Sequence, residues 1–229
     1  MVLDIFISGE NINLCIPTKD FALSSRWYSW FNNPKINRFL AQGVFPNTPD
    51  LQVKFFEEEK FKRLLLIISN KREYMGVVSL SNVDLINKTA ELAIVVDSTV
   101  DTRNTPMIAL EATARISEHA FQIMGLKRIS AGQHYKLDGW QQRMELLGYR
   151  VEGIKTNAFV KGTEVADIVM IAATYDDYLR ILRFRSAYWD SSVKMLERAK
   201  KLPKRKFIDC LNDLFNGERE NYYSSNFAL

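Results

Sequence analysis

The stretch from residue 89 to residue 125 limits the fold of this 229-residue chain more than any other. A run rich in Ala, Ile and Val opens it, a polar segment with a proline follows, and a long run of helical period closes it at Gly125. This order predicts a strand, a turn and a helix. A helix N-terminus just beyond a strand offers backbone N–H groups and a positive dipole end to an anion. We therefore expect a phosphate-bearing ligand at this turn.

The rest of the chain predicts an α+β fold. Short polar connections between the strand candidates 64–69, 74–83 and 90–97 favour antiparallel hairpins. Thr48 and Pro49 are placed as the N-cap and first residue of a helix. The expected order of strands and helices gives one mixed, mostly antiparallel sheet flanked by helices. The remaining candidates are strands at 11–16, 127–134, 149–155 and 166–174, and helices at 20–32, 139–147, 176–201 and 207–215.

Composition places the chain among ordinary folded domains. Hydrophobic residues make up 47% and charged residues 25%, which disfavours disordered and disulfide-rich classes. The two cysteines, Cys15 and Cys210, have no metal-ligand spacing and indicate a reducing compartment. The first residues lack a basic start before their apolar run, and no run of eighteen apolar residues occurs. We expect a cytoplasmic protein without a signal peptide, a membrane span or a metal.

The charge is unevenly distributed along the chain. Residues 180–206 hold ten Lys or Arg against Asp190 and Glu197, although the whole chain has a net charge of only +4. The pattern predicts a domain at 1–175 and a basic helical C-terminal extension at 176–229. The basic segment could bind an anionic ligand or an acidic partner protein, or it could simply be the solvated face of a helix. Nucleic-acid binding is disfavoured because the body is acidic and the aromatic residues of the basic run have helical spacing.

Several short sequence motifs occur in the order that is typical of one protein family. Trp27–Pro34 reads W-x-x-W-F-N-N-P, and residues 75–80 read MGVVSL. Later come AELAI at 90–94, GLKRI at 125–129 and ELLGYRVEG at 145–153. Together they resemble the GNAT superfamily of N-acetyltransferases, most closely the branch with ribosomal-protein N-terminal and nucleotide-amino-sugar acetyltransferases. The resemblance implies acyl transfer from acetyl-CoA, or another acyl-CoA, to an amine.

The resemblance also implies where acyl-CoA binds. Ile94, Val95 and Val96 would lie beside the pantetheine arm, and a backbone N–H among them would stabilise the oxyanion. The turn after this strand would hold the pyrophosphate, and the residues assigned to it are Arg103, Asn104, Thr105, Met107, Ile108 and Ala109.

This turn departs from the family motif, which is Arg/Gln-x-x-Gly-x-Gly/Ala. If Asn104 is aligned with the Arg/Gln position of the motif, Met107 occupies the first glycine position and only Ala109 matches the motif. If Arg103 is aligned with that position instead, Pro106 occupies the first glycine position. Proline removes one backbone donor, but it is tolerated in the first turn of a helix.

Amine attack on a thioester needs a proton acceptor, an oxyanion donor and an acid for the thiolate. The resemblance places Glu91 and His134 near the reacting centre as alternative bases, and Tyr135 is the candidate acid by chain position, with Tyr149 as an alternative. Structural roles are the alternative for Glu91 as a sheet residue, for His134 as a cap of a turn and for Tyr149 in aromatic packing.

The acceptor remains open between two kinds of amine. The basic segment favours a small anionic amine such as a nucleotide-linked amino sugar, and a protein N-terminus is the alternative. The resemblance places Trp27, Trp30, Phe31 and Phe45 over the acceptor side. Because the turn lacks the glycines of the pyrophosphate motif, a further hypothesis is that the chain is a binding module of the same fold that does not bind CoA. A homodimer through the C-terminal helices is also expected.

Overall fold

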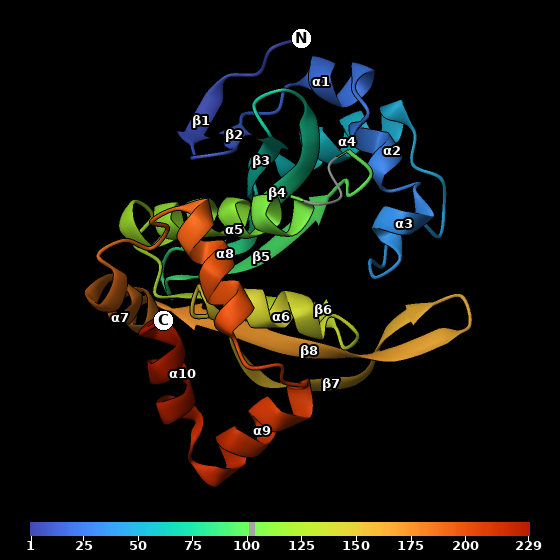
Figure 1. Ribbon diagram of the computed structural model, residues 1–229. Coiled ribbons are helices and arrows are strands. Elements are labelled where there is room, and N and C mark those ends of the chain that lie inside the picture. The colour runs from blue at the N-terminus through green and yellow to red at the C-terminus, as the bar shows by residue number, and fades with distance from the viewer. Residues whose placement is uncertain (101–103) are drawn as a thin grey trace. The chain divides into compact units, whose positions relative to one another are not determined.

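The computed structural model describes residues 1–100 and 104–229. It divides into two compact units, the first made of residues 1–83 and 91–116 and the second of residues 84–90 and 117–229. The expected α+β class is confirmed, with mostly antiparallel strands flanked by helices (Figure 1).

The first unit is built on strands in the order β1-β2-β3-β4-β5. β1 pairs antiparallel with β2, β2 with β3, and β3 with β4, as the short connections predicted. Its strands are β1 (Ile5–Ser8), β2 (Asn13–Cys15), β3 (Leu64–Ser69), β4 (Tyr74–Asp84) and β5 (Thr89–Val96). Its helices are α1 (Lys19–Ser24), α2 (Trp27–Trp30), α3 (Pro34–Asn37), α4 (Pro49–Glu59) and the first part of α5 (Thr105–Gln122).

The core of this unit explains why α1, α2 and α4 cover one face of the sheet. Phe21, Trp27 and Phe56 from these helices are buried against Ile67 and Val77 of the strands. Burying a large apolar side chain stabilises the fold by roughly 1.5–3 kcal/mol. α4 begins as expected, because Thr48 accepts a hydrogen bond from the Leu51 amide and a proline opens the helix.

The expectation of a single helix at 20–32 is wrong. The chain breaks between α1 and α2, where Ser25 is extended and its side chain accepts a hydrogen bond from the Trp27 amide. Asn33 and Pro34 then start the short helix α3, with Asn33 accepting a hydrogen bond from the Lys35 amide.

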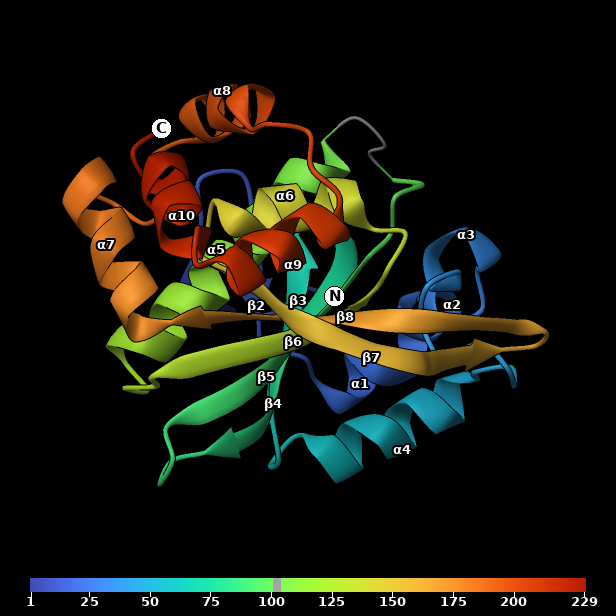
Figure 2. The same ribbon diagram turned by 90° about the horizontal axis from the view of Figure 1, so that it is seen from below.

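The second unit has strands in the order β6-β8-β7, all antiparallel (Figure 2). They are β6 (Arg128–His134), β7 (Arg150–Lys161) and β8 (Glu164–Thr174). Its helices are α6 (Asp138–Glu145), α7 (Tyr175–Arg185), α8 (Ser192–Lys201), α9 (Phe207–Asn216) and α10 (Arg219–Phe227).

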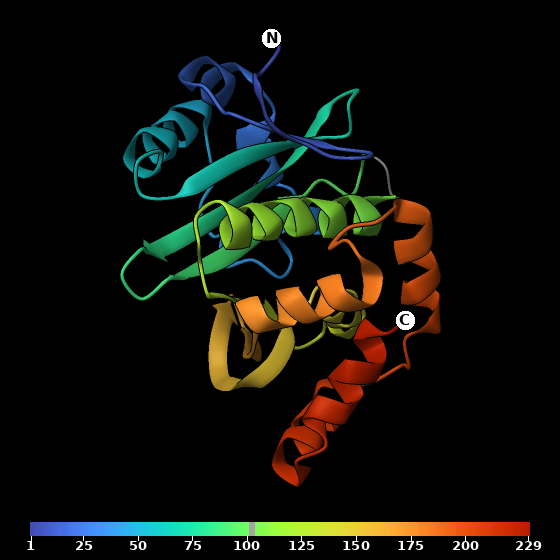
Figure 3. The ribbon, with the colours of Figure 1, turned by 90° about the vertical axis from the view of Figure 1, so that its left-hand side faces the viewer.

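The C-terminal helices pack within this second unit. α9 contacts β7, and α10 packs on α7 and α9 (Figure 3). Arg150 binds Asp177 and Glu220 in ion pairs that join β7 to α7 and α10. The single helix expected at 176–201 is wrong, because Ser186 adopts a left-handed conformation with φ 62° and ends α7.

No helix in the described part of the chain is long and apolar enough to cross a bilayer.

Candidate active site

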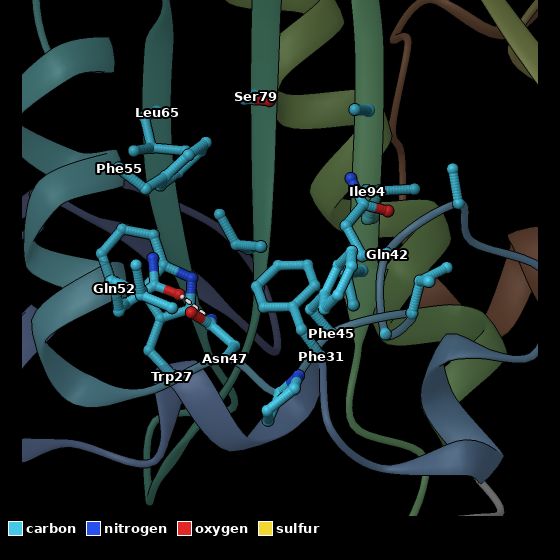
Figure 4. A pocket seen from close by; sticks show the side chains of 18 of the residues that line it. Trp27, Phe31, Gln42, Phe45, Asn47, Gln52, Phe55, Leu65, Ser79 and Ile94 are labelled. Atoms are coloured by element: carbon cyan, nitrogen blue, oxygen red, sulfur yellow. Dashed lines mark hydrogen bonds between the residues drawn. The ribbon is translucent and has the colours of Figure 1, made fainter.

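A pocket of about 500 Å³ lies in the first unit, between its helices and the face of its sheet. Figure 4 shows side chains from α2, α4, the strands and the loop 41–47 pointing toward this space. Trp27, Phe31, Phe45 and Phe55 supply aromatic rings to its wall. Gln42, Asn47, Gln52 and Ser79 supply polar groups. A cavity of this size, mostly apolar with a few polar groups, is typical of a site for a small molecule.

The loop 41–47 is held over the pocket by asparagines. The Asn32 side chain makes two hydrogen bonds of 2.7 Å to the Asn47 backbone: its amide nitrogen donates to the Asn47 carbonyl oxygen, and its amide oxygen accepts from the Asn47 backbone N–H. Asn37 donates to the carbonyl oxygen of Phe31 at 2.6 Å, and it is buried. Gly43 has φ 87°, and a Cβ there would lie 2.2 Å from the Asn37 amide nitrogen. The loop therefore needs glycine at this position and has a defined path across the pocket.

Sequence reasoning found only part of this wall. Trp27, Phe31 and Phe45, which the resemblance placed over the acceptor side, line the pocket. Trp30 does not; it is buried beside another hollow lined by Phe21 and Tyr74. Asn47 and Gln52 were missed, because their position depends on tertiary contacts.

β5 forms part of the sheet side of the pocket, together with residues of β3 and β4. Ala93, Ile94 and Val95 line it, so two residues assigned to acyl-CoA, Ile94 and Val95, lie beside the pocket. Val96, the third, is half-buried at the end of the strand. Alternate residues of a strand share a face, so exposed Glu91 is on the same face as Ala93 and Val95.

The helix expected to meet the pyrophosphate is present, and its first residues are ones that the sequence analysis assigned to the turn. α5 begins at Thr105, and the Asn104 carbonyl accepts hydrogen bonds from the Met107 and Ile108 amides, both at 2.9 Å. Pro106 lies in the first turn, where its missing N–H is tolerated. Asn104 is exposed, Thr105 and Met107 are half-buried, and Ile108 and Ala109 are buried. Arg103 lies outside the described residues.

His134 and Tyr135 belong to the second unit. His134 is buried, and its Nδ1 accepts a hydrogen bond from the Lys136 amide at 3.2 Å. Its Nε2 lies 3.4 Å from a carboxylate oxygen of Glu164. Its ring stacks on Tyr135, which is 43% exposed, and meets Phe159 edge-on. These contacts describe a histidine that caps a turn, and its role as a base stays a prediction.

Tyr149, the alternative acid, is fully buried. Its hydroxyl is 2.8 Å from the Ser117 hydroxyl. Burial raises the pKa of the Tyr149 phenol, which makes it a weaker acid than an exposed tyrosine.

The charges around the pocket are few. Of the described residues that line it, none is acidic and Arg63 alone is basic. Arg63 Nε donates to a Glu59 carboxylate oxygen at 2.6 Å. At the end of β5, buried Asp97 accepts hydrogen bonds from the Thr99 amide and hydroxyl and lies 3.5 Å from an Arg26 nitrogen. Among the described residues, no group of three or more His, Cys, Asp or Glu is arranged to hold a metal ion.

Comparisons with solved structures find the same fold elsewhere. A spermidine N-acetyltransferase from Vibrio cholerae, in complex with CoA and spermine, is 15% identical with TM-score 0.65, covering 74% of this chain and 98% of that one. Mycobacterium smegmatis RimJ, in complex with CoA-disulfide, is 16% identical with TM-score 0.64, covering 82% and 89%. The microcin C7 self-immunity acetyltransferase MccE, in complex with acetyl-CoA and AMP, is 24% identical with TM-score 0.59, covering 72% and 93%.

No curated protein matches the chain in sequence. The acetyltransferase (GNAT) domain model matches residues 20–150, which is more than half of the chain. The superfamily expected from the sequence is confirmed: the chain belongs to the GNAT acetyltransferases and is an acyl-CoA-dependent N-acyltransferase.

Proposed function

We propose that this enzyme acylates the primary amine of a small molecule held in the pocket of the first unit. The observation that carries the proposal is that Ile94 and Val95 line the pocket, while the family resemblance assigns the same residues to the acyl-CoA arm. An amine in the pocket would thus lie next to the strand that receives the thioester.

The chemistry is direct attack of the amine nitrogen on the thioester carbon. An N–C bond forms, the C–S bond breaks, and the sulfur leaves as a thiol after it gains a proton. Bound acyl-CoA supplies the thioester. Glu91 is our first choice for the group that accepts the ammonium proton, because it shares a strand face with Ala93 and Val95. His134 remains the alternative base and Tyr135 the proposed acid.

The residues at the start of α5 could bind the pyrophosphate of CoA although the glycines of the family motif are absent from this turn. The dipole of this 18-residue helix places positive potential at its N-terminus. Asn104 and Thr105 add an amide and a hydroxyl, which are groups that bind phosphate oxygens. Arg103, Met107, Ile108 and Ala109 complete the proposed cradle.

The acceptor that we favour is a nucleotide-linked amino sugar or a similar small anionic amine. The pocket supports this choice because no acidic residue is present among the described residues that line it. A polyamine such as the spermine bound to the Vibrio cholerae enzyme carries several positive charges, which carboxylates would have to balance. The alternative acceptor is a protein N-terminus, which the exposed side chains of Val44 and Phe45 at the pocket rim would suit.

A panel of amines tests the acceptor class. With saturating acetyl-CoA, we expect thiol release to be fastest with nucleotide-linked amino sugars, slower with peptides that have free N-termini, and slowest with spermidine. A preference for spermidine over both other classes would contradict the proposal.

We also propose a cytoplasmic location and a homodimer through the C-terminal helices. Cys15 and Cys210 are both unpaired and buried, as suits a reducing compartment. Ile208 and Phe215 of α9 are 56% and 82% exposed and offer an apolar surface for a second copy. Residues 1–175 would form the catalytic domain and residues 176–229 its basic extension.

A further inference from the structure

Half of the ten basic residues between 180 and 206 are bonded inside the second unit. Four of them pair with carboxylates, and the fifth is buried and donates to backbone carbonyl oxygens. The residues with these partners are Arg180, Arg185, Lys194, Arg198 and Arg205. Much of the basic character of this segment therefore serves the fold itself.

The remaining cations concentrate in one short stretch. Lys200, Lys201, Lys204 and Lys206 are exposed, and none of them forms an ion pair with a described residue. Glu197, one turn earlier on α8, is exposed and pairs with none of them in the described part of the chain. The stretch 200–206 thus carries positive charge that the second unit does not balance.

The stability of the helices explains only part of this charge. Lys200 and Lys201 lie in the last turn of α8, where a cation interacts favourably with the helix dipole. Lys206, by contrast, is the N-cap of α9, and Lys204 lies two residues before it. A cation near a helix N-terminus is unfavourable, because that end already carries positive potential. The chain gathers positive charge where α9 alone would favour negative charge.

The backbone between α8 and α9 is held in one path. Figure 1 shows this segment joining the two helices. Gln142 of α6 donates hydrogen bonds of 3.1 Å to the carbonyl oxygens of both Pro203 and Arg205. Leu202 is buried, and Arg205 Cζ lies 3.8 Å from the centre of the Tyr222 ring. Side chains on a fixed backbone lose less conformational freedom when a partner binds them.

Apolar side chains flank the lysines on α8. Val193 and Leu196 are 66% and 43% exposed, and with Lys200 they follow steps of three and four, so they share one face of the helix. The opposite face holds Met195 and Arg198, which are buried in the fold. A helix that lies on a membrane inserts its apolar face into the lipid. In α8 the main apolar face is already covered, which disfavours a lipid surface as the partner.

The composition of this stretch disfavours nucleic acid. No aromatic residue occurs between residues 190 and 206, so the bases of a single strand would have no ring to stack on. The cations without an ion pair to a described residue are lysines, which lack the planar fork that lets arginine bind a phosphate with two hydrogen bonds. Carboxylates of a protein need neither feature to pair with an ammonium group.

We propose that this surface binds an acidic segment of a partner protein, with carboxylates on the lysines and apolar side chains beside them on α8. The lysine surface is formed by Val193, Leu196, Lys200, Lys201, Lys204 and Lys206. Complementary charge of this kind speeds association and selects the partner. The inference does not depend on which amine the enzyme acylates, because the lysine surface lies outside the pocket that holds the acceptor.

Calorimetric titration of the intact chain with a synthetic peptide of repeated Glu-Glu-Leu triplets tests the proposal. We expect binding that weakens at least tenfold between about 50 mM and about 500 mM salt, because salt screens exposed charges. Vesicles that contain phosphatidylserine and single-stranded polyuridine are the competing probes. Absence of peptide binding at the lower salt concentration, or tighter binding of either competing probe, would overturn the inference.

A double variant assigns the binding to the unbalanced lysines. Lys204→Gln combined with Lys206→Gln should weaken peptide binding about tenfold, through the loss of two ion pairs. Its melting temperature should not fall, because these cations do not stabilise α9. Lys35→Gln combined with Lys155→Gln is the matched control, since both lysines are exposed, lie outside the lysine surface and have no ion pair to a described residue. Equal weakening in both double variants would contradict the proposal.

Val193→Ala tests the apolar part of the surface. It should weaken the Glu-Glu-Leu peptide about threefold, because less apolar area is covered, and leave polyglutamate binding unchanged. An equal effect on both peptides would contradict a role for this side chain. Acetyl transfer to a small amine should proceed at the same rate in all these variants. Peptide binding without any acyl transfer would refute the proposed function and leave the lysine surface standing, and acyl transfer without peptide binding would have the opposite meaning.

Discussion

Substitution of Phe45 should change acceptor binding without changing the stability of the fold. Its side chain is 83% exposed although it lines the pocket, so Phe45→Ala removes almost no packing from the folded chain. Substitutions at such exposed sites change stability by no more than about 0.5 kcal/mol. The variant should therefore unfold at the same temperature as the unchanged protein.

The effect on the acceptor follows from the area that a ligand would cover. Full burial of a phenylalanine side chain is worth about 1.5–3 kcal/mol. A ligand that covers half of the Phe45 ring would gain about 1 kcal/mol or somewhat more, which corresponds to roughly a fivefold to tenfold change in affinity. We expect KM for the acceptor to rise by that factor while KM for acetyl-CoA stays unchanged.

The assay is thiol release at varied acceptor concentration and saturating acetyl-CoA. Phe61→Ala is the matched control, because Phe61 is 88% exposed and does not line the pocket. An acceptor KM within twofold of the unchanged enzyme in Phe45→Ala, or an equal rise in Phe61→Ala, would refute this account of the pocket.

Three further substitutions test the base, a buried acid and a tight turn. Glu91→Gln should lower kcat by about 10²–10⁴ if Glu91 is the base; if neither it nor His134→Ala lowers kcat tenfold, both assignments fail. Burial raises the pKa of the Glu145 carboxyl in the folded state, so unfolding releases its proton and stability falls as pH rises above the unfolded pKa of about 4.5. Glu145→Gln should therefore raise the melting temperature more at pH 8 than at pH 5, and an equal shift at both would contradict this. Gly9→Ala would place a Cβ 2.5 Å from a carboxylate oxygen of Glu111 and should cost about 1–3 kcal/mol in urea unfolding, whereas Gly153→Ala, with open space around it, should be neutral.

Local signals in the sequence predicted much of the fold. The N-cap at Thr48 and the hairpin of β3 and β4 depend on neighbouring residues, and both are present. Gly125 and Gly217 have positive φ beyond the ends of α5 and α9, as a helix stop requires. Such features are readable because short-range hydrogen bonds and backbone sterics decide them.

The missed elements depend on contacts between distant residues. Ser186 interrupts a charged run that has continuous helical character, and serine gives no signal for a left-handed stop. β1 pairs with β2 around a turn where Glu111 of α5 accepts hydrogen bonds from the Glu10 and Asn11 amides, about a hundred residues away in the chain. No local pattern encodes that contact.

In the candidate site, too, some features could be predicted from the sequence and others depend on contacts between distant residues. Aromatic residues near the start of the chain indicated one wall of the pocket, because the family resemblance placed them there. The loop 41–47 has no periodicity, and its path depends on the Asn32–Asn47 pair and on the Gln52 contact. Gly43 adopts a positive φ in this loop, a conformation that glycine accommodates, but its neighbours in the sequence do not indicate that the loop crosses a pocket.

The most direct test of the central claim is binding and use of acetyl-CoA by the intact chain. Acetyl-CoA at a hundred times its dissociation constant should add about 2.7 kcal/mol to the free energy of unfolding. Addition of an amine to that complex should then release free CoA thiol with the acyl group transferred to nitrogen. No thermal shift at millimolar acetyl-CoA, together with no amine-dependent thiol release, would contradict the assignment of this chain as an acyl-CoA-dependent N-acyltransferase.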